Sequence, residues 1–419
     1  MRLVVKNVAK LESADIELKG ITVVVGNNNT GKSTVGKILC SILGALYNLD
    51  ERVHDLKRLG IEKTLTREIA SGIIWDNEIR TEISAFLDGQ HSSRQFVDGI
   101  EKIIGSESLY EKRAKICHEV DSILNIPQEE LVATVLRRYF ESVFNYQVLP
   151  LTPGGGTSDI VLTMNQQSMG LKFTKKDSSL KSAIKCSHRA FYLENPDIVS
   201  LLDSRNINSH GSGVFANELL TAIRHYDWNT TINPADGAID DILNNGKMKA
   251  VDQVLNRVLH GEVIISREKG FVFRDDGLAS DLFLPNLSMG IKSFALLQML
   301  LKFNVLKSED ILVLDEPEIH LHPEWQLVYA EFIVLLQREY NLTILLASHS
   351  PDFIQAIRLF AKKYGTYRNV NAYLSYIQDN GMARFDAVAG EGWDAVFKKF
   401  MPTIEILTEL RESTMELQQ

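Results

Sequence analysis

The sequence predicts an α/β fold, with a mixed β-sheet flanked by helices and a large helical and β insertion. Three observations support this. An apolar run at 21–25 ends in a glycine-containing loop and is followed by a helical pattern of apolar residues. Two further apolar runs, 311–314 and 343–347, are typical of buried strands. A long stretch with both helical and strand patterns separates the first run from the other two.

The N-terminal residues predict a small β unit. Residues 2–8 are typical of a strand, and 14–19 alternate in polarity as a second strand does. Gly20 then turns the chain into the third strand, 21–25. The helix expected after the loop has apolar residues at helical spacing, at Val35, Ile38, Leu39, Ile42, Leu43 and Leu46.

The loop between this strand and helix matches G-x-x-x-x-G-K-[ST]. Its residues are Gly26, Asn27, Asn28, Asn29, Thr30, Gly31, Lys32, Ser33 and Thr34. Glycines allow the backbone N–H groups to point at phosphate oxygens, and Lys32 can reach the β and γ phosphates. Ser33 can place its hydroxyl on Mg²⁺. A chance glycine loop is the alternative, but the strand before it and the helix after it favour a nucleoside triphosphate site.

Composition narrows the class of protein. The chain has 419 residues, enough for two or three compact units, and a formal net charge of −9. That balance gives no global basic field for nucleic acid, although a local basic patch remains open. Cys40, Cys117 and Cys186 have no metal or disulfide spacing, so we expect a reducing cytoplasm. We see neither a secretion signal nor an apolar run long enough to span a membrane.

The middle of the chain divides by pattern. Residues 51–145 are helical and lack a sustained heptad repeat, so we expect a bundle of helices rather than a long coiled-coil arm. Strand patterns at 159–164 and 170–174 predict a hairpin, as do those at 262–266 and 270–274. The expected domains are an ATP-binding head at 1–50 and 281–395, a helical insertion at 51–145, a β subdomain at 146–195, a helical and β insertion at 196–280, and a C-terminal helix at 396–419.

Two carboxylates follow the apolar strand at 311–314. Asp315 is placed to join the shell of a magnesium ion, and Glu316 to orient or deprotonate an attacking water. Acids commonly follow strands as solvated ends, but the independent phosphate loop favours the catalytic interpretation. Strand patterns at 372–376 and 383–387 flank Asp379-Asn380-Gly381, a hairpin turn signal.

A histidine follows the second apolar run. Ser348 and His349 end the strand at 343–347, where an imidazole can sense a γ phosphate and hold the water. A packed loop histidine is the common alternative, and the position shortly after the acidic strand favours a role at the site. His320 and His322 lie two residues apart without further metal ligands at suitable spacing, so we expect a loop or interface feature there.

Two weaker candidates complete the set. Ser288 and Gly290 head a predicted helix and offer a hydroxyl and backbone N–H groups to an anion, although a serine there is usually only an N-cap. Gln147 follows a helical segment and could touch Mg²⁺, which a surface glutamine would explain equally well. Trp325 is expected to be packed rather than functional.

The motifs GNNNTGKST, LSMGIKS, LDEPEIHLHP and ASHSPDF occur in the order found in ATP-binding-cassette ATPases. The chain resembles most the branch with overlapping-lysogenization-defect nucleases, recombination mediator ATPases and SMC-like repair ATPases. The resemblance covers roughly 1–47 and 284–388. Met289 and Ile291 depart from the transporter form LSGGQ, which argues against a transporter subunit.

The resemblance implies a pair of heads, or a higher oligomer, with ATP and Mg²⁺ between them. One head would hold the nucleotide through Lys32 and Ser33, with Asp315 and Glu316 serving metal and water. His349 would be the switch histidine, and Ser288 and Gly290 of the other head would cap the γ phosphate.

After Asp352 we find no D-x-D pair, so the chain resembles such an ATPase without its TOPRIM nuclease. By analogy, the leading hypothesis is an ATPase sensor or scaffold of a bacterial anti-phage defence or toxin system, with a separate nuclease or toxin as effector. The alternative is a DNA-binding recombination or repair ATPase of the SMC-like class, and a transporter subunit is less favoured.

Overall fold

The computed structural model describes residues 1–68, 77–104, 112–152, 156–202, 213–232, 238–266, 268–388 and 393–398. Most of the C-terminal helix predicted at 396–419 lies outside the described residues. Helix α12, Trp393–Lys398, is the last described element. Within the described residues, no helix is both long enough and apolar enough to cross a membrane.

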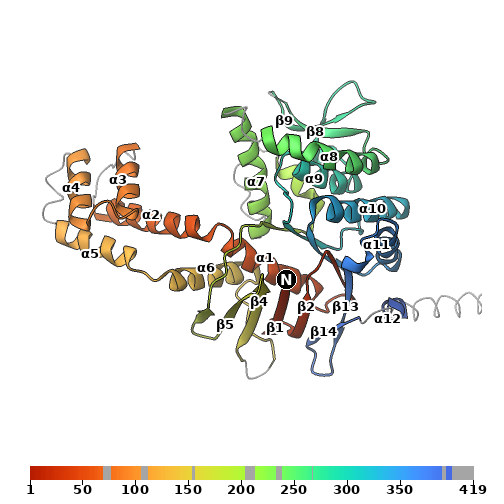
Figure 1. The fold of residues 1–419 in the computed structure, drawn as a ribbon, viewed down its shortest axis with the longest axis horizontal. Coiled ribbons are helices and arrows are strands. Elements are labelled where there is room, and N and C mark those ends of the chain that lie inside the picture. Colours follow the sequence, from red (N-terminus) through yellow and green to blue (C-terminus); the bar gives the residue numbers. More distant parts are fainter. Residues whose placement is uncertain are drawn as a thin grey trace, which may run out of the picture.

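An eleven-stranded mixed sheet forms the centre of the molecule (Figure 1). Its spatial order is β6-β5-β4-β1-β2-β14-β13-β3-β12-β11-β7. The bounds of the strands are β1 Arg2–Val8, β2 Leu11–Glu17, β3 Ile21–Gly26, β4 Ser158–Met164, β5 Gln167–Phe173, β6 Ser178–Lys181, β7 Ala190–Leu193, β11 Ile311–Asp315, β12 Thr343–Ser348, β13 Val370–Ile377 and β14 Ala383–Ala387. The predicted mixed α/β class is therefore confirmed.

Five neighbouring strands, β13, β3, β12, β11 and β7, run parallel. Their carboxyl ends consequently meet at one edge of the sheet, where ligands bind in open α/β folds. The predicted strands at 311–314 and 343–347 are β11 and β12, and the hairpin predicted around 379–381 is β13 and β14. The strand predicted at 14–19 begins earlier, at Leu11, because Leu11 pairs with Val8 in a tight turn.

The β subdomain predicted at 146–195 does not form a sheet of its own. Strand β4 pairs antiparallel with β1, so β4, β5 and β6 continue the central sheet at one edge. Strand β7 joins the opposite edge beside β11. The hairpin of 159–164 and 170–174 is present as β4 and β5, but sequence patterns carry no information about a partner strand so distant along the chain.

Both faces of the sheet are buried, and alternating residues of β3 divide between two apolar clusters. Ile21, Val23 and Val25 pack on one face with residues of helices α9, α10 and α11, whereas Val24 packs on the other face with helices α1 and α6. The bounds of the helices in the head are α1 Lys32–Leu46, α6 Gln128–Val143, α7 Gly213–Ile232, α8 Ala238–Leu255, which packs on α10, α9 Met289–Lys302, α10 Pro323–Tyr340 and α11 Pro351–Lys363. Short 3₁₀ helices occupy Pro196–Leu202, Leu284–Asn286 and Tyr367–Asn369.

Four helices project from the head as an arm (Figure 1). They are α2 Leu49–Glu68, α3 Asn77–Leu87, α4 Ser93–Ile104 and α5 Arg113–Leu124. A separate apolar cluster, including the stacked rings of Phe86 and Phe96, holds them together. The helices predicted for 51–145 are therefore confirmed, but α6 packs on α1 in the head instead of joining this cluster. The base of the arm leads into α1, the helix that begins at the phosphate loop.

A second, antiparallel sheet lies beside α8 and α9 (Figure 1). It consists of β8 Gly261–Ser266, β9 Gly270–Asp275 and β10 Leu282–Phe283. The pairing of β8 with β9 confirms the hairpin predicted at 262–266 and 270–274. Val263 and Phe273 face the apolar cluster that also contains Leu297, which attaches this sheet to α9.

Candidate nucleotide-binding site

The loop predicted to hold phosphate connects the end of β3 with the start of α1. Gly26 ends the strand where no side chain fits, since a Cβ there would lie 1.9 Å from Oγ of Ser375. Gly31 caps α1 with φ 82°, a left-handed conformation that glycine adopts without strain. Asn27, Asn28 and Asn29 are exposed between these glycines. The result is a tight turn whose backbone leads directly into a helix N-terminus, the arrangement that favours anions.

Lys32 is buried and its ammonium lies inside the loop. Nζ donates hydrogen bonds to the carbonyl oxygens of Gly26 at 2.9 Å and Asn27 at 3.0 Å. Thr30 stabilises the same turn from the other side, because its hydroxyl contacts the carbonyl of Asn27 at 2.7 Å and Oγ of Ser375 at 2.6 Å. The loop thus holds a positive charge among backbone groups rather than in solvent. Ser33 and Thr34 occupy the first turn of α1 and are partly exposed.

Glu316 and His349 meet Lys32 at the carboxyl edge of the sheet. Oε1 of Glu316 lies 3.6 Å from Nζ of Lys32 and 3.2 Å from Nδ1 of His349. The three residues follow the three adjacent strands β3, β11 and β12, so the parallel pairing brings them together. Glu316 has φ 51° and its N–H donates to the carbonyl of Ala347 at 2.8 Å, which fixes the turn that carries the carboxylate. The carboxylate is accessible, with 27% of its side chain exposed.

Asp315 ends β11 with a buried carboxylate. Its Oδ2 accepts a hydrogen bond from the hydroxyl of Tyr192 at 2.5 Å. Its Oδ1 is buried and has no hydrogen-bond partner within the described part of the chain. A buried carboxylate oxygen with an open position beside a phosphate loop is a suitable ligand for Mg²⁺, which commonly takes one or two carboxylates and completes its shell with phosphate and water. No cluster of three His, Cys, Asp or Glu side chains forms a metal cage among the described residues. Asp315 and Ser33 therefore fit a magnesium ion that arrives with phosphate.

A second acid lies behind this edge. Glu318 is almost fully buried, and its Oε1 accepts a hydrogen bond from Oγ of Ser348. Burial raises the pKa of the Glu318 carboxyl above its usual range, while the Ser348 hydrogen bond and the nearby His349 act in the opposite direction. Glu318 thereby connects the turn after β11 with the end of β12.

The signature-like segment begins α9. Ser288 is exposed and is the N-cap of this helix, with Oγ accepting from the N–H of Ile291 at 3.4 Å. Gly290 is buried and lies close to Trp325. A Cβ at this position would be only 3.1 Å from the indole. Lys292 donates to Oδ1 of Asp197 at 2.6 Å and anchors the helix to the 3₁₀ helix Pro196–Leu202. Unlike Lys32, Glu316 and His349, Ser288 makes its hydrogen bond within its own helix.

The remaining candidates are outside this group of contacts. Gln147 is exposed in the turn after α6, and its N–H donates to the carbonyl of Phe144 at 2.9 Å. His322 is the N-cap of α10, and the carbonyl of His320 lies close to Gly290. Trp325 packs edge-on against Phe294 with 6.1 Å between ring centroids, as expected of a packed side chain.

Residues 195–355 match the family model described as "AAA domain, putative AbiEii toxin, Type IV TA system". This part of the chain resembles an AAA ATPase domain. The match includes Ser288, Asp315, Glu316 and His349 and begins well after the phosphate loop at Lys32. The match covers less than half of the chain and lies apart from the phosphate loop, so the two observations are independent of each other. Comparison with curated proteins gives no match.

Three similar solved structures are heads of SMC proteins. The SMC head bound to the C-winged helix domain of ScpA is 11% identical, covers 93% of this chain and 97% of its own, and has a TM-score of 0.46. The SMC head domain from Thermotoga maritima is 11% identical, with 93% and 98% covered and a TM-score of 0.39. The Smc head with an extended coiled coil bound to the C-terminal domain of ScpA from Pyrococcus furiosus is 10% identical, with 98% of both chains covered and a TM-score of 0.40.

Sequence reasoning did not find three residues that shape the site. These residues are Tyr192, Glu318 and Ser375. Each acts through a partner that is distant in the sequence, such as Asp315 for Tyr192. No local pattern identifies such a partner. A tyrosine in a strand next to the acidic strand is the single signal that could have suggested the first of these contacts.

Proposed function

We propose that this chain is a Mg²⁺-dependent ATPase whose heads pair around bound ATP. The observation that supports it best is the contact series from Lys32 through Glu316 to His349, at the carboxyl ends of three adjacent parallel strands. A basic group for phosphate, an acid for water and an imidazole for orientation are the parts that phosphoryl transfer to water requires.

Each residue has a defined task in this mechanism. The loop amides and Lys32 bind the β and γ phosphates, for which Lys32 exchanges its carbonyl partners Gly26 and Asn27. Glu316 accepts a proton from the attacking water, and His349 orients that water and contacts the γ phosphate. Asp315 and Ser33 would hold Mg²⁺, whereas Gln147 lies outside this group of contacts and is not assigned a role. Bound Mg²⁺ neutralises charge that develops on the phosphate oxygens.

The second copy supplies Ser288 and Gly290. Ser288 is exposed at a helix N-terminus and does not share the contacts of its own phosphate loop, as expected of a group that caps nucleotide on a partner. Helix α9 is fixed by Lys292 and Trp325, so it can present this end without rearranging.

We propose a domain division that follows the sheet. The head contains 1–50 and 281–395 together with β4–β7, which the sequence had assigned to a separate β subdomain. The arm of α2–α5 belongs to the helical insertion at 51–145, and α7, α8, β8 and β9 belong to the insertion at 196–280. The arm and these insertions are the surfaces available to partners.

We also propose a cellular role in the cytoplasm, as the sensor or scaffold of an anti-phage defence or toxin system with a separate effector. The matched family is described as a putative toxin of a type IV system, which supports a place among such systems. The chain would then couple ATP occupancy to the release or activation of a nuclease or toxin.

The test measures ATP hydrolysis and the molecular mass of the protein with and without ATP. Wild-type protein should release phosphate from ATP with Mg²⁺, and Lys32→Ala should abolish nucleotide binding. Glu316→Gln should lower hydrolysis by at least about 100-fold and form a dimer with ATP, read by light scattering after size exclusion. Lys6→Ala, at an exposed position in β1, is the control. A Glu316→Gln protein that stays monomeric with ATP contradicts the paired heads.

A separate measurement distinguishes the two cellular roles. Purification with a neighbouring gene product that is toxic alone supports the defence role. Stimulation of hydrolysis by DNA, with binding that weakens steeply as salt rises, instead supports a repair ATPase. The net charge of −9 favours the first outcome.

A further inference from the structure

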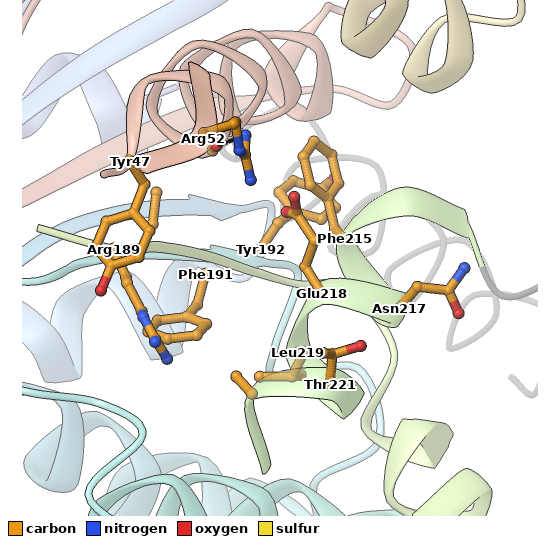
Figure 2. Close-up of a pocket in the computed structure, with 13 residues that line it drawn as sticks. Tyr47, Arg52, Arg189, Phe191, Tyr192, Phe215, Asn217, Glu218, Leu219 and Thr221 are labelled. Atoms are coloured by element: carbon orange, nitrogen blue, oxygen red, sulfur yellow. Dashed lines mark hydrogen bonds between the residues drawn. The ribbon is translucent and has the colours of Figure 1, made fainter. Parts of the chain in front are cut away.

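A pocket of about 350 Å³ lies at the opposite end of α1 from the phosphate loop. It is open to solvent on one side and is lined by the end of α1, by β7 and by the start of α7 (Figure 2). Lys32 begins α1 and Gly44 near its end lines the pocket, so about 20 Å of helix separates the two sites. The pocket is therefore distinct from the nucleotide site, and its volume is typical of a small-molecule site.

Aromatic rings give the pocket a flat apolar interior. Phe191 forms its base, while Tyr47 lies on one side and Phe215 on the other (Figure 2). The rings of Phe215 and Tyr192 pack with 5.1 Å between their centroids. Such walls favour a planar ring, which gains stacking as well as apolar contact.

One end of the pocket carries an acid that the ATPase mechanism does not use. Glu218 is partly buried and accepts a hydrogen bond from the hydroxyl of Tyr139. Arg52 holds Tyr139 at 3.2 Å and also donates to the carbonyl of Gly44 at 2.5 Å. Burial raises the pKa of the Glu218 carboxyl. This carboxyl is fixed in place and has a further oxygen to accept N–H groups from a ligand.

The other end is basic. The guanidinium of Arg189 lies over the ring of Tyr47, with 5.0 Å to its centroid. An adjoining cavity of about 720 Å³ shares Arg52 and Arg189 and adds Lys307. Two acids line it as well, but Asp55 is paired with Arg58 at 3.2 Å, and Glu51 accepts a hydrogen bond from Asn48. Arginine donors at this position suit a phosphate or carboxylate.

The pocket is connected to the nucleotide site by one side chain. The ring of Tyr192 lines the pocket, and its hydroxyl donates to Oδ2 of Asp315. The same ring lies against α1, since a Cβ at Gly36 would be 3.1 Å from it. A ligand that displaces the Tyr192–Phe215 pair must therefore change the hydrogen bond that orients Asp315.

We propose that this pocket binds a purine nucleoside monophosphate as a regulatory ligand, and that Tyr192 transmits its binding to Asp315. The ring lies between Tyr47 and Phe215, an exocyclic N–H group faces Glu218, and the phosphate reaches Arg189 and the cavity beyond it. Regulation of hydrolysis rests on the proposed ATPase function, whereas occupation of the pocket does not.

Binding is tested first, by calorimetry with GMP and with AMP as probes. The protein carries Lys32→Ala, so the phosphate loop does not contribute a second site. We expect one site per chain for at least one probe, weakened about tenfold by Glu218→Gln and by Arg189→Gln. Glu78→Gln and Arg80→Gln, exposed on the arm, are the matched controls and should bind as the Lys32→Ala protein does.

Thr221→Trp blocks the pocket in a protein that should still fold. Thr221 is exposed at the rim, so a large side chain there fills the pocket without entering a core. The variant should abolish probe binding while the melting temperature stays unchanged. Absence of binding by both probes overturns the ligand class. Binding that is insensitive to Glu218→Gln, Arg189→Gln and Thr221→Trp overturns the site.

Transmission is tested in protein with Lys32 intact. The bound probe should change the rate of ATP hydrolysis at least about threefold, and Tyr192→Phe should remove this effect while probe affinity changes less than about twofold. A bound probe that leaves hydrolysis unchanged overturns the coupling. If wild-type protein hydrolyses no ATP, the ATPase proposal fails, and the calorimetry still decides whether the pocket binds a nucleotide.

Discussion

The hydroxyl of Tyr192 donates a hydrogen bond to Oδ2 of Asp315 at 2.5 Å, between residues 123 positions apart in the sequence. Tyr192 stands in β7 and Asp315 at the end of the adjacent strand β11. The contact leaves Oδ1 of Asp315 as the oxygen available to a metal, since Oδ1 has no hydrogen-bond partner among the described residues. Tyr192 is therefore a positioning residue for the carboxylate rather than a ligand itself.

This contact predicts the effect of Tyr192→Phe. The variant keeps the ring and loses the donor, so Asp315 is less well oriented and the Mg²⁺ concentration for half-maximal hydrolysis should rise about tenfold. Nucleotide binding without Mg²⁺ should change little. Tyr340→Phe is the control, because it removes another buried hydroxyl that has no hydrogen-bond partner among the described residues. An unchanged Mg²⁺ dependence would show that Asp315 is oriented by other contacts.

Gly26→Ala should disable the phosphate loop. The new methyl group would overlap Oγ of Ser375 and also press on Oγ1 of Thr30, 2.7 Å away, so the end of β3 must shift. We expect nucleotide affinity to fall at least about tenfold and the free energy of unfolding to fall by about 1–3 kcal/mol. Titration calorimetry and denaturant unfolding measure the two effects. Gly246→Ala in helix α8, where a Cβ has nothing within 4 Å, should leave nucleotide affinity unchanged and raise the free energy of unfolding by about 0.5–1 kcal/mol.

Glu318 predicts a pH dependence of stability. Because burial raises its folded-state pKa, the folded protein binds a proton more tightly than the unfolded chain does. Its contribution is therefore fully present below the ordinary pKa of 4.5 and is lost as the pH rises through the folded-state value. Glu318→Gln keeps an acceptor for Ser348 and does not titrate, so the variant should gain about 1 kcal/mol relative to wild type at pH 7.

Denaturant unfolding between pH 4 and pH 8 measures this difference. Wild type and Glu318→Gln should converge at the acidic end and separate as the pH rises. The exposed Glu268→Gln is the control and should follow wild type throughout. A constant difference at every pH would show that the carboxyl does not titrate in this range.

Ser288→Arg tests whether a second copy contacts the nucleotide. Ser288 is exposed, so an arginine there should leave the monomer folded and its ATP affinity unchanged. In a Glu316→Gln background, the bulky charge should prevent the ATP-dependent dimer, read by light scattering. Ser122→Arg, exposed on α5 in the arm, should still dimerise. Dimers formed equally by both variants would move the interface away from α9.

Local patterns were sufficient for the elements that carry the proposed catalytic groups. Lys32, Glu316 and His349 each follow a short apolar strand, and parallel pairing makes the ends of such strands adjacent. The same patterns were insufficient for β4–β6, because a hairpin is recognisable from its own residues whereas its partner β1 is not. Side-chain pairs such as Tyr192 with Asp315, or Thr30 with Ser375, depend on the whole fold and leave no trace in either segment.

The position of β13 in the sheet affects how the chain folds while it is synthesised on the ribosome. Val370–Ile377 lies between β3 and β14, so β3 lacks its neighbour β13 and β2 lacks its neighbour β14 until nearly all described residues have been synthesised. Until then, the growing chain exposes open strand edges that other chains can pair with. Truncated or stalled products should consequently depend on chaperones to remain unaggregated, and the full-length protein should fold slowly for its size.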